Sequence, residues 1–260
     1  MCLILFAYDV HPAYRLVLLA NRDEFYARPT APAAFWPEAP ELLAGRDLVA
    51  GGTWLGVSRG GRLAAVTNYR DPSDERHGPS RGLLTRDFLL TTAAPRPFLA
   101  KRDPPAGAYC GFNLLFGDGD GLSYYSNRDD GLRPVSAGLY GLSNHLLDTP
   151  WPKVTRGRNA LARALALPAP LDEDQLLALL ADRSMAPDDQ LPETGVGPEW
   201  ERILSPTFII SPRYGTRASS LLLIDIRGHV TFMERRFAAD GRSAGEGHFE
   251  FDSAAWARPL

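Results

Sequence analysis

Cysteine is scarce in this chain of 260 residues, where only Cys2 and Cys110 occur. Two cysteines are too few for the disulfide framework that holds small secreted proteins together. The apolar run after Met1 also lacks the basic segment and the length of a secretory signal peptide. We therefore expect the protein to work in the reducing environment of the cytoplasm.

Long hydrophobic runs and charge of one sign are also missing. No stretch approaches the roughly 20 apolar residues of a membrane-spanning helix, so an integral membrane protein is not expected. The 28 basic and 31 acidic residues give a net charge of -3 and are spread along the chain, which leaves no basic stripe for nucleic acid. These absences favour a small-molecule ligand, and nothing in the sequence indicates an oligomeric state.

Recognised metal and nucleotide motifs are absent too. The chain contains no CxxC, no HExxH and no P-loop, and its five histidines show no ligand spacing. The sequence therefore predicts no metal site and no cofactor that catalysis would require.

The residues that are present indicate an α+β fold. With 45% hydrophobic residues the chain can bury one large core, and we expect a single domain over residues 1–260. Helical spacing of apolar residues predicts helices within residues 80–95, 151–167 and 172–182. Apolar runs bounded by turn residues predict antiparallel strands at 3–8, 14–20, 53–57, 63–67, 111–116, 122–126, 207–211, 218–226 and 229–237. Two blocks of strands separated by helices favour sheets packed on each other with helices outside.

Two segments show no regular period. Residues 28–40 are rich in Pro and Ala, which predicts a long loop over the surface or over a site, in the manner of a lid. Residues 238–260 predict a loosely ordered tail from which aromatic side chains could dock, namely Phe249, Phe251 and Trp256.

The position of Cys2 carries the first functional hypothesis. A methionine before so small a side chain is normally removed, so Cys2 would carry a thiol and a free α-amine together. The amine, with a pKa of about 7.7–8.0, can accept the proton of a thiol whose pKa is about 8.5. The alternative is a cysteine that packs as a small apolar residue at the start of a strand.

A series of motifs follows along nearly the whole chain. It comprises Met1-Cys2, Asn21-Arg22-Asp23-Glu24, Gly52-Thr53-Trp54-Leu55-Gly56, Thr67-Asn68-Tyr69-Arg70, Ser80-Arg81-Gly82, Gly111-Phe112-Asn113, Leu142-Ser143-Asn144, Asp148-Thr149-Pro150-Trp151-Pro152-Lys153 and Tyr214-Gly215-Thr216-Arg217. In these motifs the sequence resembles the NRDE-motif family, also called the transport and Golgi organization 2 family, within the wider N-terminal-nucleophile hydrolase fold. The resemblance implies a four-layer αββα sandwich of two stacked, mainly antiparallel sheets flanked by helices.

The chain is also similar to the choloylglycine and penicillin V acylases, whose sites combine an N-terminal Cys, an early Arg and Asp, two Asn and a late Arg. This similarity implies a catalytic set of Cys2, Arg22, Asp23, Asn68, Asn144 and Arg217, with Asn21, Glu24, Tyr69 and Trp54 as supporting motif residues. The acylases space the early Arg and Asp three apart, whereas here the two residues are adjacent.

The chemistry of acyl transfer gives each residue type a role. A cation favours a thiolate, and Arg22 or Arg217 would supply it. Asp23 would orient the α-ammonium or an arginine. Asn68 and Asn144 offer amide donors to an oxyanion, although asparagine side chains also commonly stabilise turns.

Two functions therefore stay open. In the first, Cys2 cleaves an amide or thioester of a small amphipathic acyl compound, without a cofactor. In the second, the same cleft binds haem, acyl-CoA or lipid for trafficking without turnover, because members of the family are linked to haem trafficking and acyl-CoA handling. Haem would need an axial ligand or an apolar enclosure.

Overall fold

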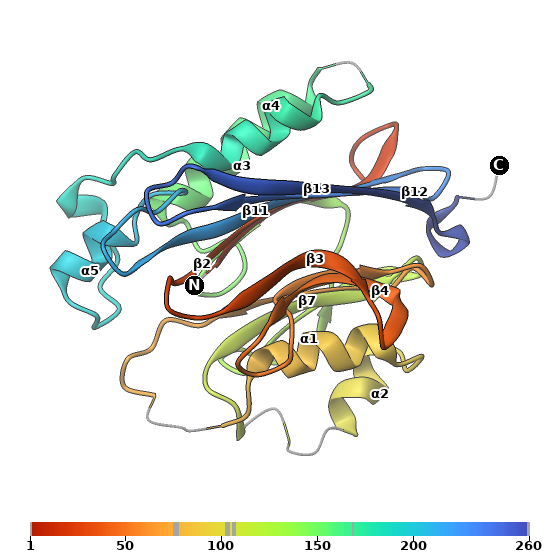
Figure 1. Ribbon diagram of the computed structural model, residues 1–260, viewed down its shortest axis with the longest axis horizontal. Helices are drawn as coiled ribbons and strands as arrows, with labels where there is room; N and C mark the ends of the chain where they lie inside the picture. The colour runs from red at the N-terminus through yellow and green to blue at the C-terminus, as the bar shows by residue number, and fades with distance from the viewer. Residues whose placement is uncertain (1, 75–77, 102–104, 106–107, 168, 259–260) are drawn as a thin grey trace.

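Two antiparallel sheets face each other in the computed structural model, which describes residues 2–74, 78–101, 105, 108–167 and 169–258 (Figure 1). The six-stranded sheet runs in the order β10 (Gly138–Leu142), β1 (Cys2–Tyr8), β2 (Tyr14–Phe25), β11 (Tyr214–Asp225), β12 (His229–Phe237) and β13 (Ser243–Asp252). The seven-stranded sheet runs in the order β3 (Thr30–Trp36), β4 (Ala39–Asp47), β5 (Leu55–Ser58), β6 (Leu63–Asn68), β7 (Phe112–Asp118), β8 (Gly121–Ser126) and β9 (Arg133–Pro134).

Helices cover the outer face of each sheet, which gives four layers. Helices α3 (Pro152–Leu165) and α4 (Glu173–Ala178) pack on the six-stranded sheet, and α1 (Arg81–Leu90) packs on the seven-stranded sheet with α2 (Pro95–Ala100) beside it (Figure 1). A short helix, α5 (Pro198–Ile203), lies at the end of the six-stranded sheet. The predicted αββα sandwich is confirmed. No helix in the described part of the chain is long and apolar enough to cross a membrane.

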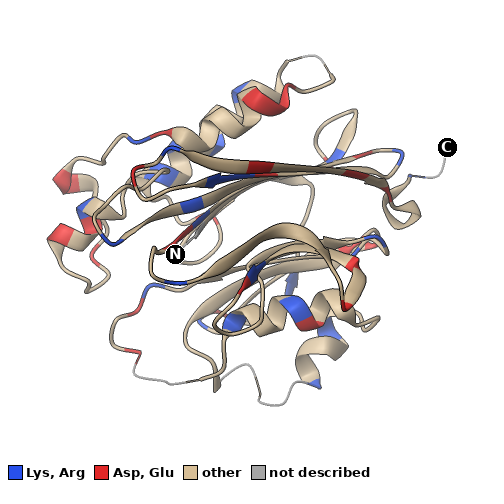
Figure 2. Ribbon diagram, viewed as in Figure 1, with Lys and Arg blue, Asp and Glu red and all other residues tan. Residues whose placement is uncertain are grey.

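Strand alternation divides the apolar residues among three layers of core. Along β2, Leu16 and Leu18 face the seven-stranded sheet, while Val17 and Leu19 face the leucines of α3 and α4. A third cluster joins the seven-stranded sheet to α1 through Phe88 and its neighbours. Basic and acidic residues are interspersed over both sheets and the helices (Figure 2).

The segment predicted as a loop at residues 28–40 is largely strand instead. β3 and the start of β4 form a hairpin at the edge of the seven-stranded sheet. Pro32 is exposed on this edge strand, where the missing N–H costs nothing, so its presence does not exclude a strand. The prediction of a lid here was wrong.

The predicted tail is also ordered as far as residue 258. β13 pairs with β12, and the chain then packs the indole of Trp256 into the core, where Nε1 donates to the Gly61 carbonyl over 2.7 Å. Phe251 is buried as well, so the expected docking of tail aromatics is confirmed for these two residues. Residues 259 and 260 lie outside the described chain.

Two strand predictions near the site differ from the structure. The strand predicted at residues 207–211 is absent apart from one bridge between Ile210 and Gly215. Conversely, β2 does not end near residue 20 but continues to Phe25, because it pairs with β11 along its whole length. The polar Asn21-Arg22-Asp23-Glu24 segment therefore lies on a strand of the sheet rather than in a loop.

Candidate functional site

The backbone register places the first residues of β1 beside the Asn21-Arg22-Asp23-Glu24 segment of β2. Cys2 pairs with Arg22, and Leu3 pairs with Asn21. On the other side of β2, Arg22 pairs with Ala218 of β11. Position 2, Arg22 and Ala218 therefore form one row across the sheet.

The side chain of Asn21 has a structural role in the fold. Its side chain is fully buried, and its Nδ2 donates to the carbonyls of Leu180 and Thr207 over 2.9 Å each. Its Oδ1 accepts a hydrogen bond from Ser219 Oγ over 2.6 Å. These bonds join β2 to the segments on the helical side of the sheet, and they account for an asparagine at this position without a ligand.

Asp23 is a buried carboxylate held from β11. Thr216 Oγ1 donates to Asp23 Oδ1 over 2.7 Å, and the Tyr214 hydroxyl donates to the Asp23 backbone carbonyl over 2.9 Å. Burial raises the pKa of Asp23, and the nearby charges of Lys153 and Arg22 act in the opposite direction. Sequence reasoning missed Lys153 as a member of this group, although it lies in one of the motifs.

A cavity of about 120 Å³ opens at this end of the two sheets, and we call it the NRDE cavity. It is lined by Arg22, Asp23, Glu24, Arg28, Asp47, Thr53, Trp54, Val66, Asn68, Ser80, Arg81 and Gly82. Four of the predicted motif residues on β2 and β6 thus share one cavity: Arg22, Asp23, Glu24 and Asn68.

Two glycines close one wall of the NRDE cavity. A Cβ on Gly52 would lie 2.3 Å from the backbone carbon of Gly82, and Thr53 N donates to the Gly82 carbonyl over 3.0 Å. Only glycine permits this approach, since real Cβ atoms do not come so close to a backbone. The glycines therefore fix where Thr53 and the start of α1 meet the cavity.

Asn68 and Asn144 come together at the end of β6. Asn144 is fully buried, and its Nδ2 donates to the backbone carbonyl of Asn68 over 2.9 Å. The Asn68 side chain lines the NRDE cavity and makes no hydrogen bond to any described residue. Asn144 is thus placed to position Asn68, whose amide is available to a ligand.

Tyr69 lies away from the cavity lining. Its hydroxyl is 2.7 Å from His145 Nε2, and the two rings pack with centroids 4.8 Å apart. Burial raises the pKa of Tyr69 and lowers that of His145. The pair stabilises the loop that carries Asn144.

Arg22 separates the NRDE cavity from a second one. Its guanidinium carbon lies 4.3 Å from the centroid of a Trp54 ring, a cation–π contact between the two sheets. Trp54 can lie flat there because residue 45 is glycine: a Cβ on Gly45 would be 2.4 Å from the indole. Arg22 and Trp54 line both cavities.

The second cavity, of about 170 Å³, contains three arginines, and we call it the arginine cavity. Its lining consists of Arg22, Thr30, Ala31, Pro32, Trp54, Arg217, Ala218, Glu234, Arg236, Phe237 and Ala244. Arg217, expected beside Cys2, lies here. Its Nη1 donates to the carbonyls of Phe25 and Arg28 over 3.0 and 3.1 Å, so it also holds the turn between β2 and β3.

Glu234 is a buried acid that sequence reasoning missed. It is 2% exposed, and its Oε1 accepts a hydrogen bond from the Ala33 N–H over 2.8 Å. Burial raises its pKa, against the opposing effects of the Ala33 bond and of Arg236 and Arg22. A sequence signal exists: Glu234 continues the alternation of Val230 and Phe232, which face the core between the sheets.

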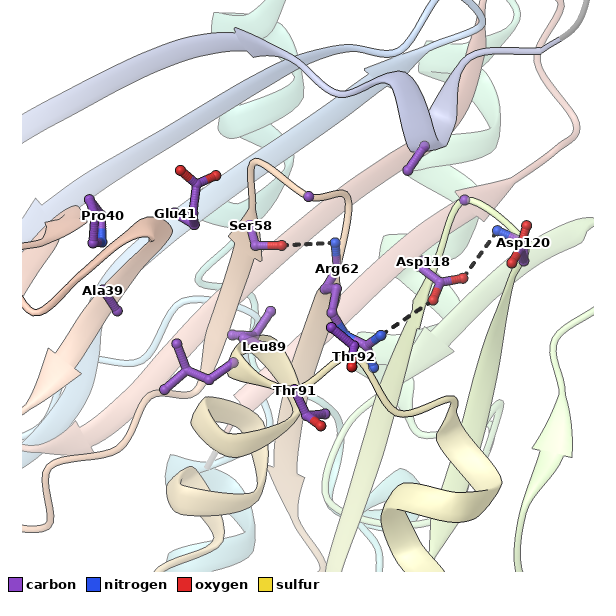
Figure 3. Close-up of a pocket in the computed structure, with 14 residues that line it drawn as sticks. Ala39, Pro40, Glu41, Ser58, Arg62, Leu89, Thr91, Thr92, Asp118 and Asp120 are labelled. Carbon is purple, nitrogen blue, oxygen red and sulfur yellow. Dashed lines mark hydrogen bonds and ion pairs between the residues drawn. The ribbon is translucent and has the colours of Figure 1, made fainter.

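A cavity of about 550 Å³, larger than the NRDE and arginine cavities, lies elsewhere, where the turn between β5 and β6 meets α1 (Figure 3). This turn is at the opposite end of β6 from Asn68. Its arginine, Arg62, donates to the carbonyls of Phe88 and Ala93 and pairs with Asp118, so the charge is used to tie α1 to the sheet. The polar groups that match the predicted site are in the two smaller cavities. Among the described residues no cluster of His, Cys, Asp and Glu is arranged to hold a metal ion.

Comparisons with known proteins cover most of the chain. The model of the family described as Transport and Golgi organisation 2 matches residues 1–239. The human protein named Transport and Golgi organization protein 2 homolog is 40% identical over 255 residues, which cover 90% of this chain and 92% of the relative. The Drosophila melanogaster protein named Transport and Golgi organization protein 2 is 28% identical over 260 residues, covering 90% of this chain and 91% of the relative.

One solved structure is similar at low identity. It is a Caenorhabditis elegans N-acylethanolamine-hydrolyzing acid amidase ortholog, with a TM-score of 0.48 and 9% identity, covering 86% of this chain and 92% of that chain.

Proposed function

The chain belongs to the transport and Golgi organisation 2 family, and we propose that it is an acyl hydrolase whose nucleophile is Cys2. The observation that carries this proposal is the register of β1 with β2, which pairs the backbone of Cys2 with that of Arg22, a residue that lines the NRDE cavity. A cation beside a thiol favours the thiolate, and a buried arginine does not lose its proton. The substrate is an amide or thioester of a small amphipathic acyl compound.

Removal of Met1 makes the α-amine of Cys2 the base. The amine takes the thiol proton, and the thiolate attacks the acyl carbon to give a tetrahedral intermediate. The oxyanion accepts a hydrogen bond from the Asn68 amide, which has no other partner in the described chain. Asn144 is a positioning residue, because it holds the Asn68 backbone and does not itself need to touch the substrate.

Collapse of the intermediate breaks the bond to the leaving group, and the α-ammonium returns its proton to the departing amine or thiolate. A water molecule, deprotonated by the same amine, then attacks the thioester on Cys2. The second collapse releases a carboxylic acid and restores the thiol. Asp23 follows Arg22 on β2 and is the buried acid of this group; burial raises its pKa, and the charge of Lys153 opposes that rise.

Substitution of Cys2 tests the proposal. Cys2→Ser keeps the size of the side chain, so a hydrolase should lose turnover of amide and thioester panels by orders of magnitude while ligand binding persists. The matched control is Cys110→Ser, which should retain full activity. If neither Cys2→Ser nor Cys110→Ser turns over any member of the panels but both variants bind haem or an acyl-CoA, the cleft is a binding site without catalysis. The hydrolase proposal then fails.

A further inference from the structure

We propose that the arginine cavity is an anion-binding subsite that holds a carboxylate or phosphate group at the far end of the acyl substrate. The inference rests on the proposed function, which places the acyl carbon of the substrate at Cys2. It adds that the opposite end of the substrate carries a negative charge. Its lining has three arginines, Arg22, Arg217 and Arg236, against one acid, Glu234. The remaining wall is largely apolar, with Trp54 as its largest side chain.

The register of the sheet leads from Cys2 to this subsite. Cys2 pairs with Arg22, Arg22 with Ala218, and Ala218 with Arg236. Residues directly opposite each other in an antiparallel sheet share a face, and neighbouring strands are about 4.8 Å apart. The row from Cys2 to Arg236 therefore crosses three strand spacings, about 14 Å of sheet. The small residue Ala218 in the middle leaves room above the sheet.

Arg236 is the arginine whose unpaired donor most favours a bound anion. Its Nε is buried and has no hydrogen-bond partner, and the side chain forms no ion pair with any described residue. A buried donor without a partner costs free energy that a bound oxyanion would recover. The guanidinium lies over Gly245, where a Cβ would be 2.3 Å from Nη2, so the glycine makes space for it.

The positive charge of the arginine cavity is not neutralised by the hydrogen bonds of Arg217 and Glu234. Arg217 bonds backbone carbonyls, which leaves its charge uncompensated. Glu234 lies at the base of the cavity with its Oε1 on the Ala33 N–H, and it has no hydrogen bond to Arg236. The apolar part of the cavity lining, which includes Trp54, Ala218 and Phe237, fits an alkyl chain, and the arginines fit its anionic end.

The test compares two probes in direct binding. One is a decanoyl anilide, and the other is the same anilide with a terminal carboxylate in place of the methyl group. Titration calorimetry with the Cys2→Ser protein measures both, so the result does not depend on turnover. We expect the carboxylate probe to bind at least tenfold more tightly at low salt, and the preference to shrink at high salt.

Arg236→Gln should remove that preference, and Arg236→Lys should retain part of it. The matched control is Arg235→Gln on the same strand, whose guanidinium pairs with Glu246 and Asp174 on the other face. It should keep the full preference. Equal affinity for the two probes, no binding of either, or a preference that survives Arg236→Gln in a folded protein would each overturn the subsite. Absence of turnover with the preference intact would remove only the hydrolase.

Discussion

The side-chain amide of Asn144 donates to the backbone carbonyl of Asn68 over 2.9 Å, and this bond ties the loop after β10 to the end of β6. The bond is reinforced along the backbone, since Arg70 N donates to the Asn144 carbonyl over 2.7 Å. The two asparagines of the predicted site are therefore unequal. One is a buried structural donor, and the other presents its side chain to the NRDE cavity.

This difference predicts that alanine at Asn144 mainly lowers stability, whereas alanine at Asn68 mainly lowers turnover. Asn144→Ala leaves the partly buried Asn68 carbonyl without this donor, so we expect a loss of about 1–3 kcal/mol of stability in urea unfolding. Asn68→Ala removes no bond within the described chain, so stability should change by less than about 0.5 kcal/mol. If Asn68 binds the oxyanion, the turnover of the Asn68→Ala variant should fall by a factor of about 10²–10³. Equal stability losses in the two variants would contradict this assignment.

The stacking of Arg22 on Trp54 can be tested without changing either residue. A Cβ at Gly45 would lie 2.4 Å from the indole, so Gly45→Ala should displace Trp54 and destabilise the protein by about 1–3 kcal/mol. Gly60→Ala is the control, because its Cβ would meet only Ser58 Oγ at 3.7 Å. That change should be neutral or stabilising by up to about 1 kcal/mol. A neutral Gly45→Ala would show that Trp54 is not held as described.

Glu234 predicts a pH dependence of stability. Burial raises its folded-state pKa above the ordinary value of 4.5. Stability is then lost as the pH rises from about 4.5 through the folded pKa, because the native state holds the proton more tightly than the unfolded chain. Glu234→Gln can still accept from the Ala33 N–H but cannot ionise. Thermal melts of both proteins should therefore show the variant gaining relative to wild type as the pH rises from 4 to 8; a constant difference would mean that the pKa is not raised.

A buried ion pair beside the site predicts strong coupling. Arg70 and Glu201 form a hydrogen-bonded pair with both side chains almost completely buried, and Arg70 also stacks on Trp151. Removing one partner leaves the other charge buried without the opposite charge of this pair, so Arg70→Met and Glu201→Gln should each cost about 3–5 kcal/mol. The double variant should cost much less than the sum, as urea unfolding of all four proteins would measure. Additive losses would argue against a direct pair.

Local sequence patterns predicted most of the sheet but not its edges. The strand at His229–Phe237 was predicted with the bounds it has, because its apolar and β-branched residues follow directly on the Arg227-Gly228 turn. The four edge strands, β3, β9, β10 and β13, were missed, and so was β4 beside β3. The edge strands β3 and β13 carry Pro, Gly and charge on an exposed side, which look like loop sequence.

For the site, too, motifs along the chain predicted some residues, while others depend on contacts between segments far apart in the sequence. Family motifs indicated Arg22, Asp23 and Asn68, which line one cavity, but they could not show that Arg217 lies in the next cavity. That placement depends on a register shift in β11 between Thr216 and Ala218, which no local pattern reveals. Glu234 was missed although it continues the alternation of Val230 and Phe232, because an acid at such a position indicates burial only once the facing sheet is known.

The most direct test of the account is the mass of the protein during turnover. The protein is incubated with a panel of acyl thioesters and amides, quenched in acid and digested, and the N-terminal peptide is weighed. If Cys2 is the nucleophile, we expect a peptide that starts at Cys2 and carries an acyl group on that residue, with no adduct in Cys2→Ser under the same conditions. A fully active protein that retains Met1, or acyl groups found only on Cys110, would contradict it.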